Sequence, residues 1–242
     1  MTRLCVSALS IRRNGATLLA NVGFTASGGE FIGLVGPNGS GKTTLLRALA
    51  GFEAGAAPAV LIDGMALGAL APRQRALKIA YLPQQREVAF AINAEAVVAL
   101  GRFAFGAPHR LGPAGHAAVN RALDATDANA FRFRTMATLS GGEQARVHLA
   151  RALAAEAPIL LADEPTAALD PRHQRAIMTA LRDKADAGGL VIAALHDLAL
   201  ARRLCSRLII LDRGAIVADA PATEALTADI VEKVFGLGLH EL

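Results

Sequence analysis

The sequence lacks tryptophan, has only two cysteines, and contains no apolar run long enough to cross a membrane. Cys5 and Cys205 lie far apart and belong to no metal-binding motif, which argues against a disulfide framework or a cysteine metal site. A spanning helix needs roughly 20 mostly apolar residues, whereas runs such as 159–162 and 190–195 are short and bounded by charge, Gly or Pro. These absences exclude a disulfide-stapled secreted domain and an integral membrane protein.

A secretory leader and a basic cluster are also missing. Arg3 is not followed by an apolar core of roughly 7–15 residues with a cleavage site, so we expect a protein that stays in the cytosol. The 25 basic and 21 acidic residues give a net charge of +4, but the basic ones are scattered, and their longest runs are pairs at 12–13 and 202–203. Proteins that bind nucleic acid more often cluster such residues. The sequence therefore predicts no nucleic-acid partner, although proximity to an anionic membrane remains compatible.

The hydrophobic residues point to an α/β fold. They make up 53% of the 242 residues and are mostly Ala, Leu, Val and Ile, which suits buried parallel strands flanked by helices. We expect short strands and turns over 1–30, and a mostly helical region over 85–155. The local patterns predict strands at 31–35, 159–162 and 190–195, a hairpin over 207–219, and helices at about 43–50, 145–155 and after Thr227.

The first chemical motif is a glycine-rich phosphate loop between the predicted strand and helix near residue 40. It matches G-x-x-x-x-G-K-[ST] and comprises Gly36, Pro37, Asn38, Gly39, Ser40, Gly41, Lys42, Thr43 and Thr44. Glycines let backbone N–H groups converge on phosphate oxygens, and the helix N-terminus adds a favourable dipole. Lys42 is expected to reach the β- and γ-phosphates of ATP, and the Thr43 hydroxyl to ligate Mg²⁺.

The second motif is a pair of carboxylates that follows an apolar strand. Residues 159–162 deliver Asp163 and Glu164 to the carboxyl end of this strand, where ligands bind in open parallel sheets. Asp163 is expected to hold the Mg²⁺ shell, and Glu164 to act as the general base that polarises the attacking water.

The third motif is Leu139-Ser140-Gly141-Gly142-Glu143, at the start of a helix. Ser140 is a natural N-cap, and Glu143 sits where a capping box places its carboxylate. The two glycines also expose a bare helix N-terminus that can bind an anion. One nucleotide pocket does not need two such sites, so this motif is best used to cover a nucleotide bound to another subunit.

These three motifs, in this order and spacing, make nearly the whole chain resemble an ATP-binding-cassette (ABC) ATPase. The resemblance implies one α/β domain over 1–242, with a RecA-like phosphate-loop core and an N-terminal antiparallel β subdomain. The core would comprise 1–84 and 151–242, and residues 85–150 an inserted α-helical subdomain. It also implies a head-to-tail homodimer that sandwiches ATP between the phosphate loop of one copy and the LSGGE of the other.

The resemblance assigns further residues one at a time. In Tyr81-Leu82-Pro83-Gln84, Gln84 matches the glutamine that contacts Mg²⁺ and water, and His196 matches the switch histidine that contacts the γ-phosphate. Asp170, in Ala168-Leu169-Asp170, matches the loop that couples the two ATP sites. Many relatives stack adenine on an aromatic residue near the position of Arg13, where this chain has none. The Arg13 guanidinium is expected to substitute, because it can stack on a ring.

Two finer stretches, 97–103 and 169–174, resemble the ATPases of importers for iron-siderophore, haem and cobalamin. This implies a homodimer on the cytoplasmic face of the cell membrane, docked through a groove near 85–110 on separate permease subunits. A substrate-binding protein would be an indirect partner. Three alternatives stay open: a cassette ATPase that drives iron–sulfur cluster assembly, the ATPase of another transporter class, and a cassette acting on ribosomes or DNA. A phosphate-loop kinase or GTPase would not need LSGGE.

Overall fold

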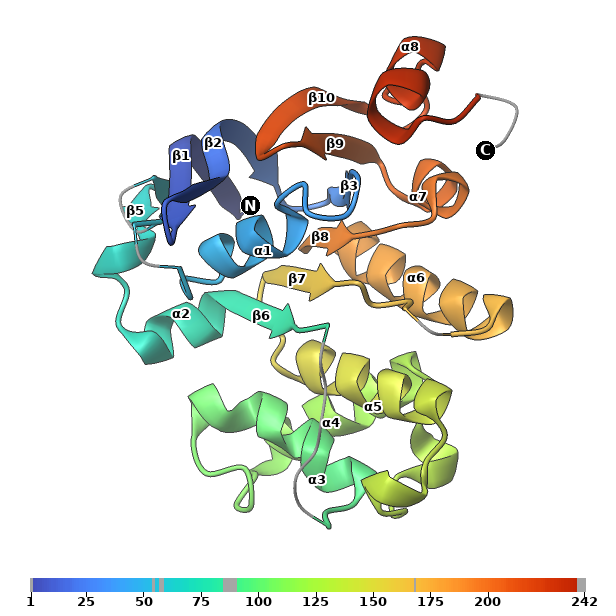
Figure 1. Ribbon diagram of the computed structural model, residues 1–242. Helices are drawn as coiled ribbons and strands as arrows, with labels where there is room; N and C mark the ends of the chain where they lie inside the picture. The colour runs from blue at the N-terminus through green and yellow to red at the C-terminus, as the bar shows by residue number, and fades with distance from the viewer. Residues whose placement is uncertain (1, 54, 57–58, 85–90, 168, 239–242) are drawn as a thin grey trace.

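The computed structural model describes residues 2–53, 55–56, 59–84, 91–167 and 169–238. It contains two β-sheets with helices around them and a separate helical lobe below the larger sheet (Figure 1). This arrangement confirms the predicted phosphate-loop α/β cassette with an N-terminal antiparallel sheet and an inserted helical region.

The larger sheet has six strands and the smaller one four. In spatial order, the larger sheet comprises β10 (Ala215–Pro221), β9 (Arg207–Asp212), β3 (Phe31–Val35), β8 (Leu190–Ala194), β7 (Ile159–Asp163) and β6 (Ile79–Leu82). The smaller sheet comprises, in the same way, β2 (Ala16–Ser27), β1 (Arg3–Arg13), β4 (Val60–Ile62) and β5 (Met65–Ala66).

The helices pack around these sheets and form the lobe. The α-helices are α1 (Lys42–Leu49), α2 (Pro72–Lys78), α3 (Ala94–Ala99), α4 (Pro113–Ala125), α5 (Gly141–Ala154), α6 (Pro171–Asp186), α7 (Leu198–Leu204) and α8 (Ala228–Ile230). Short 3₁₀ turns are η1 (Leu67–Ala69), η2 (Leu100–Phe105), η3 (Asn129–Phe131) and η4 (Met136–Thr138), and α8 continues as a π-turn, η5 (Val231–Phe235).

The central strands are parallel because helical crossovers cover both faces of the sheet. Every residue of β3, β7 and β8 is buried, as expected for strands that are apolar on both sides. Ile32 and Leu34 face a core shared with α1 and the smaller sheet, whereas Phe31 and Val35 face the core formed with α5, α6 and α7. At the edge of the sheet, β10 runs antiparallel to β9 as a hairpin.

The N-terminal prediction of short strands was wrong, because β1 and β2 form one long hairpin of 11 and 12 residues. The predicted turn at Asn14 and Gly15 is present, and both residues have positive φ. The register shifts several times along the pair, with Ala8 and Asn21 also at positive φ. These bulges absorb the irregular alternation of apolar residues, so the strands continue where the sequence pattern breaks.

Helix α5 connects the helical lobe to the sheet. Ala145, Leu149 and Ala152 pack into the core under the sheet, whereas the opposite face packs through Val147 and Ala150 into the core of the lobe. Since α5 contributes to both cores and runs through residue 150, the proposed division at 150/151 remains a prediction. Among the described helices, none is both long and apolar enough to span a bilayer.

The lobe and the sheet meet closely where η2 crosses α5. A Cβ atom added to Gly101 would lie 2.1 Å from the backbone carbonyl oxygen of Arg151. We expect Gly101→Ala to lower the free energy of unfolding by about 2 kcal/mol and Tm by about 5 °C, because the two backbones must separate. Thermal unfolding followed by circular dichroism measures this.

Gly112→Ala is the matched control, because a Cβ atom there meets nothing within 4 Å and its φ of −73° suits any residue. Equal Tm values for both variants would show that the close approach of η2 to α5 carries no stability.

Candidate functional site

The phosphate loop connects β3 to α1 at the carboxyl edge of the large sheet. Gly36 and Gly41 have φ of 152° and 105°, and Cβ atoms there would lie 2.1 Å from the Leu211 carbonyl oxygen and 2.9 Å from that of Leu18. Only glycine satisfies both the backbone conformation and the lack of space. The loop is therefore fixed in shape by the hairpins packed behind it.

Lys42 is folded back under this loop. Its side-chain nitrogen donates to the carbonyl oxygens of Gly36 at 2.7 Å and Pro37 at 2.9 Å. Burial lowers the pKa of Lys42, and the carboxylates of Glu164 and Asp163 oppose that shift. A lysine side chain held at a glycine-rich loop is a suitable partner for phosphate.

A cavity of about 220 Å³ opens in front of the loop. Residues of the loop form most of its wall, and the others come from the N-terminal hairpin and the end of β7: Leu18, Asn38, Gly39, Ser40, Gly41, Lys42, Thr43, Thr44 and Glu164. Within the described part of the chain, the Ser40 hydroxyl is a buried polar atom with no hydrogen-bond partner. The cavity therefore combines backbone amides, hydroxyls and one cation, which fits a polyphosphate.

Asp163 ends β7 directly beside α1. The Thr43 hydroxyl donates to its Oδ1 at 3.1 Å, and the Tyr81 hydroxyl donates to its Oδ2 at 3.3 Å. Burial raises the pKa of this carboxyl, while the bonds from Thr43 and Tyr81 oppose that shift. The hydroxyl of Thr43, the carboxylate of Asp163 and the amide oxygen of the nearby Gln84 are the oxygen donors that Mg²⁺ prefers, so these residues fit the ion.

Glu164 is held from two sides. Its Oε1 lies 2.6 Å from Nε2 of His196, and its Oε2 accepts a hydrogen bond from Nε2 of Gln84 at 2.7 Å. Its φ is 47°, a conformation that costs a residue with a side chain of order 1–3 kcal/mol and concentrates at functional sites. The three residues predicted to be catalytic are thus brought together.

The LSGGE motif lies at the start of α5 and not at this cavity. Ser140 and Glu143 form the predicted capping box, with Glu143 accepting from the Ser140 amide at 2.7 Å. Of the described residues that line the phosphate-loop cavity, none comes from 140–143. Ser140 and Gly141, at the N-terminus of α5, are exposed.

Asp170 caps α6 next to the LSGGE motif. Its carboxylate accepts from the His173 amide at 3.0 Å and lies 2.6 Å from Nδ1 of the same residue. The His173 ring in turn lies against Gly142, where an added Cβ atom would be 3.4 Å from Nδ1. The structure therefore brings Asp170 and the LSGGE motif together through His173. Ala168, in the same predicted loop, lies outside the described residues.

Arg13 lies at the end of β1, and its side chain is about half exposed. Its guanidinium donates to both carboxylate oxygens of Glu53, at 2.8 and 2.7 Å, and Arg47 binds the same carboxylate. Both bonds come from one terminal nitrogen of the guanidinium, and about half of the side chain stays exposed. Stacking of adenine on Arg13 remains a prediction, and the partner Glu53 was not foreseen.

The contact of Tyr81, the chain's one tyrosine, with the site was not predicted from the sequence. Tyr81 pairs with Leu161 across β6 and β7, so alternation along β7 puts its side chain on the face of Asp163. Its ring packs edge-on against Phe52, with the ring centroids 5.5 Å apart. Tyr81 belongs to the motif around Gln84, so the sequence places it near the site. Its contact with Asp163, however, depends on the strand order, which local sequence does not specify.

Comparison with known proteins identifies the family of the chain. A family profile described as ABC transporter matches residues 19–167. The hemin import ATP-binding protein HmuV of Pseudomonas fluorescens (strain Pf0-1) is 43% identical over 235 residues, covering 95% of this chain and 91% of its own length. The protein of the same name from Nocardia farcinica is 42% identical over 234 residues, covering 94% of this chain and 80% of its own.

Solved structures have the same fold. A dimeric post-hydrolysis state of the ATP-binding cassette MJ0796 with ADP and Pi superposes with a TM-score of 0.76 at 28% identity, covering 92% of this chain and 99% of that one. An inward-facing putative metal-chelate type ABC transporter gives a TM-score of 0.82 at 23% identity, covering 98% and 90%. From the matched family and the relatives that span almost its full length, the chain belongs to the ABC transporter family, as one of its ATP-binding, ATP-hydrolysing subunits.

Proposed function

We propose that this chain energises import of haem, or of a chemically related iron chelate or cobalamin-type molecule, through a separate permease. The observation that carries the proposal is the likeness to hemin import ATP-binding proteins along nearly the whole chain, at 43% identity for one of them. In this arrangement the subunit does not select the transported molecule, because only a binding protein and the permease would contact that molecule. The chain would act at the cytoplasmic face of the membrane.

For the nucleotide, the phosphates would lie in the cavity of the glycine loop, against Lys42. Thr43, Asp163 and Gln84 would hold Mg²⁺, which when bound neutralises charge on the β- and γ-phosphates. The exposed face of Arg13 would support adenine. The carbonyl clamp on Lys42 supports this placement, because it holds the cation at the loop.

For hydrolysis, Glu164 would accept a proton from the attacking water as the water oxygen bonds to the γ-phosphorus. The bond from that phosphorus to the bridging oxygen of ADP breaks in the same step, and ADP and phosphate leave. His196 and Gln84 contact its two carboxylate oxygens, and these contacts support a positioning role for both. A general base must keep a fixed orientation toward the water it deprotonates. The positive φ of Glu164 is consistent with such a fixed orientation.

For assembly, two copies would pair head to tail. The start of α5, with Ser140, Gly141, Gly142 and Glu143, would close the ATP site of the second copy, and Asp170 would connect the two sites. The outward-facing capping box and its contact through His173 to Asp170 support this pairing. The likeness to a dimeric cassette at 28% identity supports it as well.

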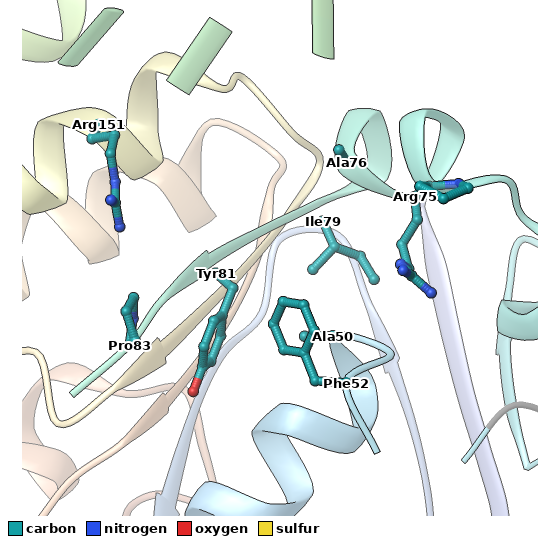
Figure 2. Close-up of a pocket in the computed structure, with 9 residues that line it drawn as sticks. Ala50, Phe52, Arg75, Ala76, Ile79, Tyr81, Pro83 and Arg151 are labelled. Atoms are coloured by element: carbon teal, nitrogen blue, oxygen red, sulfur yellow. The ribbon is translucent and has the colours of Figure 1, made fainter. Parts of the chain in front are cut away.

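A pocket of about 400 Å³ between the sheet and the helical lobe is the proposed permease contact (Figure 2). We call it the docking pocket; Phe52, Arg75, Ile79, Tyr81, Pro83 and Arg151 are among its lining residues. Phe52 is 55% exposed, and a neighbouring hollow presents Leu100 and Phe103, which is 72% exposed. Of the predicted segment 85–110, Leu100 and Phe103 would contribute the neighbouring hollow, whereas none of its described residues lines the docking pocket itself. Residues 85–90 lie outside the described residues.

The charge in the docking pocket defines its partner. Burial lowers the pKa of Arg151, and within the described chain no carboxylate pairs with Arg151 or with Arg75. A half-buried guanidinium without a counter-charge is costly. The expected occupant is therefore a short permease segment on the cytoplasmic side that combines apolar side chains with an acidic one.

Glu164→Gln tests the general base. The amide keeps the size of the side chain but cannot accept the proton, so ATP turnover is expected to fall at least about 100-fold. ATP-dependent dimers should then accumulate, as measured by size-exclusion chromatography alongside phosphate release. Turnover near that of the unmodified chain would remove Glu164 from this role.

Arg151→Glu tests the docking pocket. The reversed charge should repel the acidic permease segment, so transport by the reconstituted complex is lost while the ATPase activity of the isolated chain is retained. The matched control is Arg203→Glu, an exposed arginine on α7. If transport survives Arg151→Glu, or fails equally in both variants, the pocket is not the permease contact.

Arg13→Ala tests the adenine platform. Loss of the stacked guanidinium should weaken ATP affinity about three- to tenfold, measured by calorimetry, because such contacts contribute roughly 0.5–1 kcal/mol or somewhat more. Arg12→Ala is the neighbouring control. Unchanged affinity in the Arg13 variant would place adenine elsewhere.

Affinity purification from gently solubilised membranes tests the whole assignment. A polytopic permease in stoichiometric amount is expected, and its binding protein would identify the cargo. Recovery only from the soluble fraction with cytosolic assembly proteins would instead favour the cassette that builds iron–sulfur clusters.

A further inference from the structure

Tyr81 is the one described side chain that lines the docking pocket and also hydrogen-bonds a residue of the nucleotide site. Its ring forms the pocket wall beside Phe52, and Figure 2 shows the two rings side by side with the tyrosine oxygen pointing toward α1. At that end the hydroxyl donates to Oδ2 of Asp163 at 3.3 Å. The rigid ring of Tyr81 therefore connects the docking pocket to the nucleotide site.

The contact constrains Asp163 because each of its carboxylate oxygens has its own donor. Thr43 binds Oδ1 and Tyr81 binds Oδ2, so the plane of the carboxylate is fixed. Asp163 is 1% exposed, and water has little access to replace either donor. Burial of the hydroxyl, and next the charge of Asp163 and the bond to it, raise the pKa of Tyr81.

We propose that Tyr81 is a positioning residue that couples the occupancy of the docking pocket to the orientation of Asp163. A partner that presses on the Tyr81–Phe52 pair moves the hydroxyl and with it the carboxylate expected to hold Mg²⁺. Because such coupling is reciprocal, binding of Mg²⁺ and nucleotide must also alter the pocket wall. This inference rests on the proposed function, since it assumes both ligands.

The reciprocal direction can be measured in the isolated chain, which has no tryptophan. Phe52→Trp places a fluorophore in the docking pocket against Tyr81. Addition of Mg²⁺ and a non-hydrolysable ATP analogue is expected to change its emission. Tyr81→Phe, which keeps the ring and removes only the hydroxyl, should abolish that change in the double variant. It should also raise the Mg²⁺ concentration for half-saturation about fivefold, the effect of losing one such hydrogen bond.

The control is Phe105→Trp, placed on η2 outside the docking pocket, whose emission should respond equally with and without the Tyr81 hydroxyl. Calorimetry with the same analogue reports binding independently of fluorescence. Failure of the Phe52→Trp chain to bind the analogue would refute the proposed function itself. Normal binding, with an emission change and a Mg²⁺ requirement that Tyr81→Phe leaves unaltered, would refute only the coupling.

Discussion

The register of the parallel strands is the constraint on which the site depends. Leu34 of β3, Ala194 of β8 and Asp163 of β7 lie in one row across the sheet, because Ala194 pairs with both of the other two. The residues that follow these strands therefore emerge at one edge. The phosphate loop, the carboxylate pair and His196 meet at that edge, although Thr43 of the loop and Asp163 are 120 residues apart in the sequence. A shift of one strand by one residue would turn these side chains to opposite faces.

The glycine loop has its shape because the surrounding backbone leaves no alternative. Carbonyl oxygens of Leu211 and Leu18 fill the space that side chains at Gly36 and Gly41 would need. Both oxygens belong to hairpins that are separate from the loop in sequence, so the local conformation depends on the packing of both sheets. Lys42 then closes the loop from within, and the carboxylates of Glu164 and Asp163 oppose the lowering of its pKa by burial.

The helical lobe contributes to the site by fixing the position of the N-terminus of α5. One face of α5 packs under the sheet and the other packs in the lobe, so its capped N-terminus is held at a fixed position relative to the phosphate cavity. Gly101 permits η2 to touch the backbone of α5 near Arg151. The docking pocket is thus built from the sheet, α2 and α5 together, and movement of the lobe would change its shape.

The sequence alone determined the elements whose signals are local. The loop from Gly36 to Thr44, the apolar strand before Asp163 and the capping box at Ser140 are each written in a few consecutive residues, and the family follows from their order. Hydrogen-bonding and steric rules within about one turn or strand suffice for them. The lengths of β1 and β2 were not predicted from the sequence. β-bulges let the two strands stay paired where the alternation of apolar and polar residues breaks.

Only the tertiary structure decided which distant side chains meet. The ion pair of Arg13 with Glu53 spans 40 residues, and the hydrogen bond from Tyr81 to Asp163 spans 82. The contact of Tyr81 with Asp163 depends on the spatial order of the strands, which differs from their order in the chain. Composition and residue spacing constrain each strand separately. Which strands become neighbours depends on burying the apolar faces of both sheets and of α5 at the same time.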